Sequence, residues 1–368
     1  MPISTSFQVL LEPTTSTNEE QLYLEEWTNS SRLLFYAVIS ISIVTIPILL
    51  ISFYCIISSN RKNGRFLPYV CAILAANLVL LATIFISVLV KNTDMVYESI
   101  PGFLVCKFAA FLVNTSSCFI YWTWVAMFAE RCCYIFYPLR FHTHNAWKTT
   151  IVLICILLFS MCAQLWIPIF ITEKRLDSQM DNIYCGEDPT FSSETQLIVS
   201  LECFTTFFLP FILTIFADIS VLLWTRSLGV TIELVAREEI RGKNNETMKI
   251  VSSNSIKNTN QRRANAFRRC LISATLTLFL NLPNYSLQLL DEFFNFRDNA
   301  SIDARRIFLR IDAVFYILYL MQFPITPIHI FTLITPFSRR ESRLCRPSIL
   351  DSFRNKEGTH YNQAASIV

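Results

Sequence analysis

Residues 106–132 read CKFAAFLVNTSSCFIYWTWVAMFAERC, a stretch that opens on a cysteine and carries no charge over the 22 residues from Phe108 to Ala129. It closes on Glu130-Arg131-Cys132. An α-helix rises about 1.5 Å per residue, so roughly 20 apolar residues cross the hydrocarbon core of a bilayer. The stretch therefore predicts a membrane-spanning helix with a cysteine at one end and an acid–base pair at the other.

Six further runs in the chain have the same length and apolar character. Hydrophobic residues make up 53% of the sequence, and the runs lack the polar face that a helix of a soluble protein requires. Outer-membrane strands would instead alternate over about ten residues. We predict an all-α fold, a seven-transmembrane helix bundle whose spans are Leu33–Ser58, Phe66–Val90, Phe108–Ala129, Thr149–Thr172, Gln196–Trp224, Cys270–Leu290 and Ala313–Thr335.

The loops carry an asymmetric charge that predicts orientation, because Lys and Arg are retained on the cytoplasmic side of a membrane. With an extracellular amino terminus, 22 Lys and Arg lie inside and 9 outside, whereas 8 acids lie inside and 18 outside. We therefore expect a multi-pass plasma-membrane protein with a cytoplasmic carboxyl terminus. The basic residues indicate orientation rather than nucleic-acid binding. The polar first 32 residues contain no cleavable signal peptide, so the first helix is expected to direct insertion.

Cysteine positions favour one disulfide on the outer face. Of the 12 cysteines, only Cys106 and Cys185 lie at or beyond the outer ends of the predicted helices. Disulfides persist in oxidising compartments, so we expect these two residues to pair and to hold the second outer loop over the third helix. Two free thiols are the alternative.

Three regions are predicted along the chain: an extracellular segment 1–32, a seven-helix domain 33–335 with a long basic inner loop at 225–269, and a cytoplasmic helix and tail at 336–368. Sequons at Asn29 and Asn299 predict glycosylation. Cys345 follows a basic amphipathic stretch, which favours palmitoylation, with an unmodified thiol as the alternative. The ending Ser366-Ile367-Val368 is typical of a PDZ-domain ligand.

Several of these features together resemble the rhodopsin-like G protein-coupled receptors, from about Leu33 to Cys345. In that family 25 residues separate the cysteine that opens helix three from the arginine that closes it, the spacing of Cys106 and Arg131. Leu74-Ala75-Ala76-Asn77-Leu78 and Thr326-Pro327-Ile328-His329-Ile330 are similar to the signatures of helices two and seven. The divergence of the motifs is most similar to that of invertebrate, nematode-type orphan receptors.

The resemblance implies roles for individual residues. Glu130 would hold Arg131 back from the G-protein cleft, an ordinary helix-end salt bridge being the alternative, and Pro138 and Leu139 would contact the G protein. The residues expected to act as activation hinges are Asn77, Pro210, Pro283 and Pro327, together with a kink at Pro168. One departure is Leu280-Asn281-Leu282-Pro283, which lacks the family's tryptophan.

The ligand is constrained mainly by exclusion. The seventh span contains no lysine for a retinal linkage, and Val113 occupies the position at which amine receptors carry aspartate. Glu202 is an intramembrane carboxylate, which is costly and usually functional, and it would pair with a cationic ligand group. A protonated or internally bonded Glu202 is the alternative. The complete predicted ligand site is Glu202, Asn114, Gln164, Gln288, Asp291, Tyr316 and Tyr319.

The function that we expect is transduction of an extracellular ligand, most favourably a neuropeptide, to a heterotrimeric G protein. A chemosensory odorant receptor of the same fold is the first alternative, and a membrane transporter or channel is the alternative from another class. Membrane lipid is the remaining expected partner. No enzyme activity and no cofactor or metal is expected, since the four histidines form no cluster and the six glycines form no phosphate loop.

Overall fold

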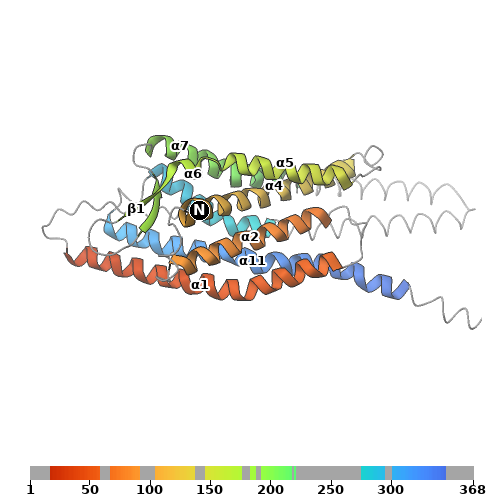
Figure 1. Ribbon diagram of the computed structural model, residues 1–368, viewed down its shortest axis with the longest axis horizontal. Helices are drawn as coiled ribbons and strands as arrows, with labels where there is room; N and C mark the ends of the chain where they lie inside the picture. The colour runs from red at the N-terminus through yellow and green to blue at the C-terminus, as the bar shows by residue number, and fades with distance from the viewer. Residues whose placement is uncertain are drawn as a thin grey trace, which may run out of the picture.

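The computed structural model describes residues 17–58, 67–91, 104–136, 146–175, 183–187, 192–217, 219–220, 275–294 and 301–344. Its elements in chain order are α1 (Thr17–Ser58), α2 (Leu67–Lys91), η1 (Leu104–Phe108), α4 (Ala109–Phe136), α5 (Ala146–Ala163), α6 (Ile167–Phe170), β1 (Ile171–Arg175), β2 (Ile183–Glu187), α7 (Ser192–Cys203), η3 (Phe204–Phe208), and α11 (Ile302–Leu344). Residues 209–217 continue the helix of η3, and residues 275–294 form a further helix. Figure 1 shows these long helices lying side by side along the length of the molecule.

Six of the described helical segments are long and apolar enough to cross a membrane, so the chain is a multi-pass membrane protein. They are Glu25–Ser58, Leu67–Val90, Cys106–Glu130, Lys148–Phe170, Gln196–Ala217 and Ile302–Ile328. Helix 275–294 overlaps the sixth predicted run, Cys270–Leu290, but is not among these six segments. Its polar residues Asn281, Asn284 and Gln288 lower its apolar character, and the first two are completely buried.

The bundle is apolar on its outside and partly polar within. Large exposed hydrophobic side chains line α1, α5 and α6, including Ile43, Ile51, Leu158 and Ile169. The buried polar residues lie between the helices: Ser42, Thr45, Asn77, Asn114, Thr115, Ser116, Ser117, Ser160, Gln164, Thr206, Asn281, Asn284, Gln322 and Thr326. This distribution suits a helix bundle whose outer surface contacts lipid. In such bundles, polar groups in the interior form hydrogen bonds between helices.

Helix α4 occupies the centre of the bundle, with the largest buried share among the six candidate spans. One apolar core joins it to α1, α2 and α11 through residues such as Leu81, Phe128 and Phe323. A second joins it to η3 and helix 275–294 through Tyr121, Phe207 and Tyr285. Both cores converge on α4, so a displacement of any neighbouring helix changes contacts with this one.

The fourth predicted span is interrupted. Helix α5 ends at Ala163 and α6 begins at Ile167, with Pro168 in its first turn. Proline has no N–H to donate to the Gln164 carbonyl, and that carbonyl accepts the Ile167 N–H instead at 3.2 Å. The expected kink at Pro168 is therefore a short turn at 164–166, which separates the two helices.

An antiparallel hairpin caps one end of the bundle. Strand β1 pairs with β2 in a register that sets Glu173 opposite Cys185, and both strands pack against η1. Figure 1 shows β1 at the end of the molecule where α1 and α11 begin. This end, which carries β1, β2 and η1, is named the hairpin end below.

The outermost helices are longer than the apolar runs indicate. Helix α1 begins at Thr17, although its apolar run begins at Leu33, so half of the segment 1–32 belongs to the helix. Helix α11 begins at Ile302 rather than Ala313 and continues without interruption to Leu344, across Pro327 and the expected boundary at 335. The two helices pack against each other more extensively than any other pair.

Candidate functional site

The fifth span contains an irregular stretch of backbone. Residues Phe204–Phe208 form a π-helical turn, after which the Leu209 N–H bonds the Phe204 carbonyl, five residues back. The next residue, Pro210, has no N–H. The Thr205 carbonyl therefore receives neither the α-type bond from Leu209 nor a π-type bond from Pro210.

A tryptophan on α4 satisfies this carbonyl. The Trp122 indole Nε1 donates to the Thr205 oxygen at 3.2 Å, and the Trp122 ring meets Phe159 of α5 edge-on at 5.4 Å between centroids. The bulge is thus fixed by a side chain from the central helix. Single-turn π-bulges are frequent at functional sites, because they rotate the preceding side chains relative to a regular helix.

Glu202 lies one residue before the last residue of α7, directly ahead of this bulge, and is partly buried. Its carboxylate lies beside Gln164 and Trp166, on the turn between α5 and α6. Gln164 also donates its Nε2 to the Thr206 hydroxyl at 3.3 Å. The structure therefore brings together Glu202 and Gln164, two residues of the predicted ligand site. We name Glu202, Gln164, Trp166 and Thr206 the carboxylate cluster.

The carboxylate cluster holds an acidic side chain, Glu202, that takes part in no ion pair among the described residues. The ion pairs of the described residues join Arg306 to Asp303 and Arg310 to Glu26, and neither involves Glu202. The buried Gln164 Oε1 also lacks a hydrogen-bond partner within the described part of the chain. The cluster can therefore accept a positively charged group together with hydrogen bonds, once a ligand displaces its present packing.

The other predicted ligand residues lie on three different helices. Asn114 is buried on α4, and Gln288 and Asp291 are partly buried on helix 275–294. Tyr316 and Tyr319 stack on α11 at 5.8 Å between centroids. The predicted site therefore includes two groups whose contacts are described, the carboxylate cluster beside the turn 164–166 and the tyrosine pair on α11.

Sequence reasoning missed an aromatic cluster between the fifth span and helix 275–294. The Phe207 and Tyr285 rings stack at 4.4 Å, and Tyr121 meets both edge-on. The Cys203 thiol contacts the Tyr285 carbonyl at 3.7 Å. The aromatic content of these spans was visible in the sequence, but apolar periodicity alone does not identify which rings meet.

A buried amide pair was also missed. The Asn281 Nδ2 donates to the Gln322 Oε1 at 2.7 Å, and both residues are almost completely buried. Asn281 lies in the stretch Leu280-Asn281-Leu282-Pro283, which sequence analysis noted only for its missing tryptophan. The signal that could have identified the pair is an uncharged amide in each of two apolar helices.

At the opposite end from the hairpin, Glu130 has a neighbour on another helix. Tyr69 of α2 is buried, and its hydroxyl forms side-chain hydrogen bonds with Glu130 and with Thr149 of α5. The side chain of Arg131 lies outside the described residues, as do Pro138 and Leu139. The predicted Glu130–Arg131 contact thus stays a prediction, and the contact with Tyr69 is new.

At the hairpin end, Cys106 is buried in η1 and is disulfide-bonded. Its expected partner Cys185 lies on β2, which packs against η1, but the Cys185 side chain is outside the described residues. The Lys107 ammonium donates to the Pro168 carbonyl at 3.0 Å and ties η1 to α6. The pairing of Cys106 with Cys185 stays a prediction.

For the remaining predicted site residues, the structure shows where they lie but does not test their roles. Asn29 is exposed on α1, Asn77 donates to the Ile73 carbonyl of its own helix at 2.8 Å, and Pro210 and Pro327 are buried. Asn299, Cys345, the loop 225–269 and Ser366–Val368 lie outside the described residues. Within the ranges that are described, no group of three His, Cys, Asp or Glu residues is placed to hold a metal ion.

No protein-family model and no curated protein sequence matches this chain. The evidence for a membrane-spanning helix bundle therefore comes from the lengths, apolar character and packing of the helices themselves.

Proposed function

We propose that this protein is a G protein-coupled receptor of the plasma membrane, with the hairpin end outside the cell. The observation that carries the proposal is the position of α4. This central helix joins the disulfide-bonded Cys106 at the hairpin end to Glu130 at the other end, and both apolar cores pack on it. A ligand that displaces helices near the hairpin thus acts on the same helix that carries Glu130-Arg131.

The proposal includes a seventh crossing by helix 275–294. Its most polar positions, Asn281 and Asn284, are buried against neighbouring helices, so its lower apolar character does not expose polar side chains to lipid. With this helix included, an odd number of crossings separates the two termini, as the charge asymmetry of the loops predicts. Agonist would act by binding the open population of the bundle more tightly.

The deciding experiment is Arg131→Ala, measured as G-protein activation in cells with surface expression quantified in parallel. We expect activation to be lost while the receptor stays at the surface. Arg140→Ala is the matched control, because it removes an arginine from the same predicted inner loop and should signal normally. Unchanged signalling by Arg131→Ala refutes the assignment, and ion flux without any G-protein response indicates a channel or transporter.

The proposed ligand is a peptide with a cationic group that reaches the carboxylate cluster. Support comes from Glu202, which lies beside the hydrogen-bonding side chains of Gln164 and Trp166 and takes part in neither the Arg306–Asp303 nor the Arg310–Glu26 ion pair. An extended peptide also suits a site that includes both Glu202 and the tyrosine pair on α11. Screening peptide and odorant libraries against cells that carry a promiscuous G protein distinguishes the two ligand classes.

A further inference from the structure

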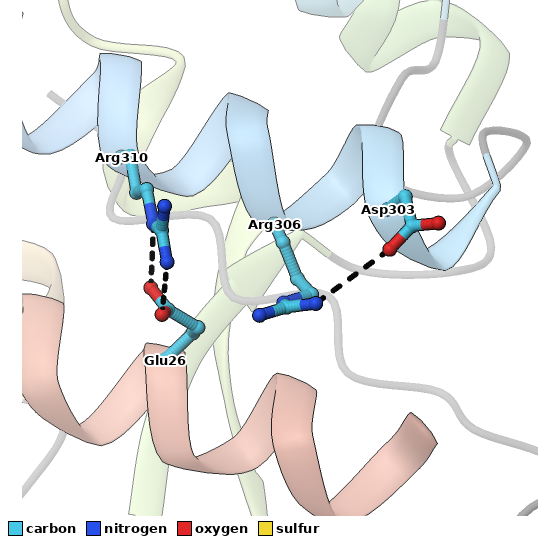
Figure 2. A network of polar contacts seen from close by, with 4 residues as sticks. All are labelled: Glu26, Asp303, Arg306 and Arg310. Carbon is cyan, nitrogen blue, oxygen red and sulfur yellow. Dashed lines mark hydrogen bonds and ion pairs between the residues drawn. The ribbon is translucent and has the colours of Figure 1, made fainter.

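The outer ends of α1 and α11 are joined by an ion pair with two contacts. Arg310 donates through Nε to the Glu26 Oε2 at 2.9 Å and through its terminal nitrogen to Oε1 (Figure 2). The Glu26 side chain is 19% exposed and the Arg310 side chain 61%, so the carboxylate is partly covered while the guanidinium faces solvent. Two parallel bonds between guanidinium and carboxylate fix the relative orientation of their helices more strictly than one contact does.

A second arginine shares this position. Arg306 lies one helical turn before Arg310, and Figure 2 shows its guanidinium on the side of α11 that faces α1. It acts electrostatically on Glu26 while contacting Asp303 of its own helix at 3.6 Å. One carboxylate of α1 thus faces two arginines of α11. We name Glu26, Arg306 and Arg310 the outer latch.

The latch lies beyond the apolar part of α1. Glu26 precedes Leu33, where the apolar run begins, and it lies in the helical extension that starts at Thr17. The extension is therefore attached to α11 rather than continuing as a free segment. Helices α1 and α11 also pack extensively along the rest of their length, so the outer latch lies at the hairpin end of a long helix–helix contact.

The same end of α11 presents a different face to the bundle interior. A helix turns about 100° per residue, so Tyr316 points roughly 120° away from Arg310 around the axis. Tyr316 stacks on the buried Tyr319, and it interacts electrostatically with Asp312. A third face, with Ile307, Ile311 and Val314, is exposed. Holding Arg310 therefore fixes the rotation of α11, which determines where Tyr316 lies.

We propose that Glu26 and Arg310 are positioning residues for the ligand site: the outer latch sets the rotation of α11 and thereby presents Tyr316 to the ligand. The amino-terminal extension of α1 is then a structural part of this site. This inference rests on the proposed receptor function for its biological meaning, but the geometry that it requires can be tested without a ligand or a G protein.

The test measures how fast an extracellular cationic thiol reagent, 2-(trimethylammonium)ethyl methanethiosulfonate, modifies Tyr316→Cys in the full chain on intact cells. The parent without Tyr316→Cys supplies the background from native cysteines. Glu26→Gln and Glu26→Arg are each added, as is the double reversal of Glu26→Arg with Arg310→Glu. We expect modification to accelerate about fivefold in the two single variants, as for the loss of one well-formed, partly covered ion pair, and to return toward the parent rate in the double reversal.

Asp303→Asn is the matched control, because it also neutralises an acid that contacts an arginine of α11. The Asp303 side chain is 89% exposed, and its described ion pair lies within α11. The rate of this variant should equal that of the parent. Unchanged rates in both Glu26 variants, an equal rise in Asp303→Asn, or a double reversal as fast as the single variants would each overturn the proposal. If Glu26→Arg fails to reach the surface, Glu26→Gln decides. The reagent measures the accessibility of position 316 on α11 and does not depend on signalling. If the Arg131→Ala experiment refutes the receptor assignment, the measured rates still test whether the latch sets the rotation of α11.

Discussion

Asn281 and Gln322 form a 2.7 Å amide hydrogen bond that joins helix 275–294 to α11 in the interior of the bundle. Asn281 is fully buried, and its Oδ1 has no hydrogen-bond partner within the described part of the chain. Gln322 is fixed further because its own carbonyl accepts the Thr326 hydroxyl at 2.8 Å. The bond is therefore a specific link between two helices that must separate if the bundle opens at that point.

Asn281→Leu is expected to destabilise the protein by about 1 to 2 kcal/mol, because it leaves the buried Gln322 Oε1 without the amide donor of Asn281. Gln322→Leu should have a similar cost. The double variant should be more stable than the sum of the two predicts, since no unpaired amide remains. Thermal unfolding in detergent micelles, followed by circular dichroism, measures all three. Thr326→Val is the control, because its hydroxyl bonds within one helix. Additive effects would mean that the two amides are not coupled.

Trp122→Phe is expected to lower stability by about 1 kcal/mol, because the Thr205 carbonyl loses the donor that replaces the missing N–H of Pro210. Trp124→Phe supplies a matched control on the same helix. The Trp124 indole nitrogen is buried without a hydrogen-bond partner among described residues, so the same substitution removes no bond there. Thermal unfolding compares the two variants directly. An equal loss of stability in both would show that ring size rather than the hydrogen bond is responsible.

The apolar runs predicted where most helices lie but not where they begin and end. Hydrophobicity reports which residues are required within the membrane, and a helix continues beyond it wherever the flanking residues have partners. Glu26 lies before the first apolar run, yet it is held in α1 by Arg310. In the fourth run the helix is interrupted where the Ile167 N–H donates to the Gln164 carbonyl, three residues back, rather than to the carbonyl four residues back. Composition does not show which of these two backbone bonds forms.

The polar residues proposed for the ligand site were visible in the sequence, but which of them meet was not. Glu202 and Gln164 were identified as polar residues in apolar helices, and they do meet, beside the turn that follows α5. Tyr316 and Tyr319 were identified too, but they stack on each other. The Asn281–Gln322 pair joins residues 41 positions apart, and its partners become evident only when the helices are packed.

Tyr69→Phe is expected to raise ligand-free signalling of the proposed receptor. The Tyr69 hydroxyl holds Glu130 from α2, and its loss would leave the acid with fewer contacts to the resting bundle. Basal G-protein activation, normalised to surface expression, provides the measurement. Tyr54→Phe is the control, since Tyr54 is 71% exposed on α1. If Tyr69→Phe signals no more than the control, the hydroxyl does not restrain the resting state.

Glu202→Gln is expected to weaken a cationic agonist at least about tenfold, since a carboxylate that pairs with a ligand cation in a partly dry site contributes more than 1 kcal/mol. The maximal response should be retained, because the substitution changes a ligand contact and leaves α4 intact. Glu25→Gln removes an exposed acid from α1 and should leave potency unchanged. The measurement is a concentration–response curve for each agonist that the library screen identifies. A cationic agonist of unchanged potency would mean that Glu202 is internally bonded and has no part in recognition, whereas weakening of a neutral agonist to the same degree would indicate a change in the fold of the site.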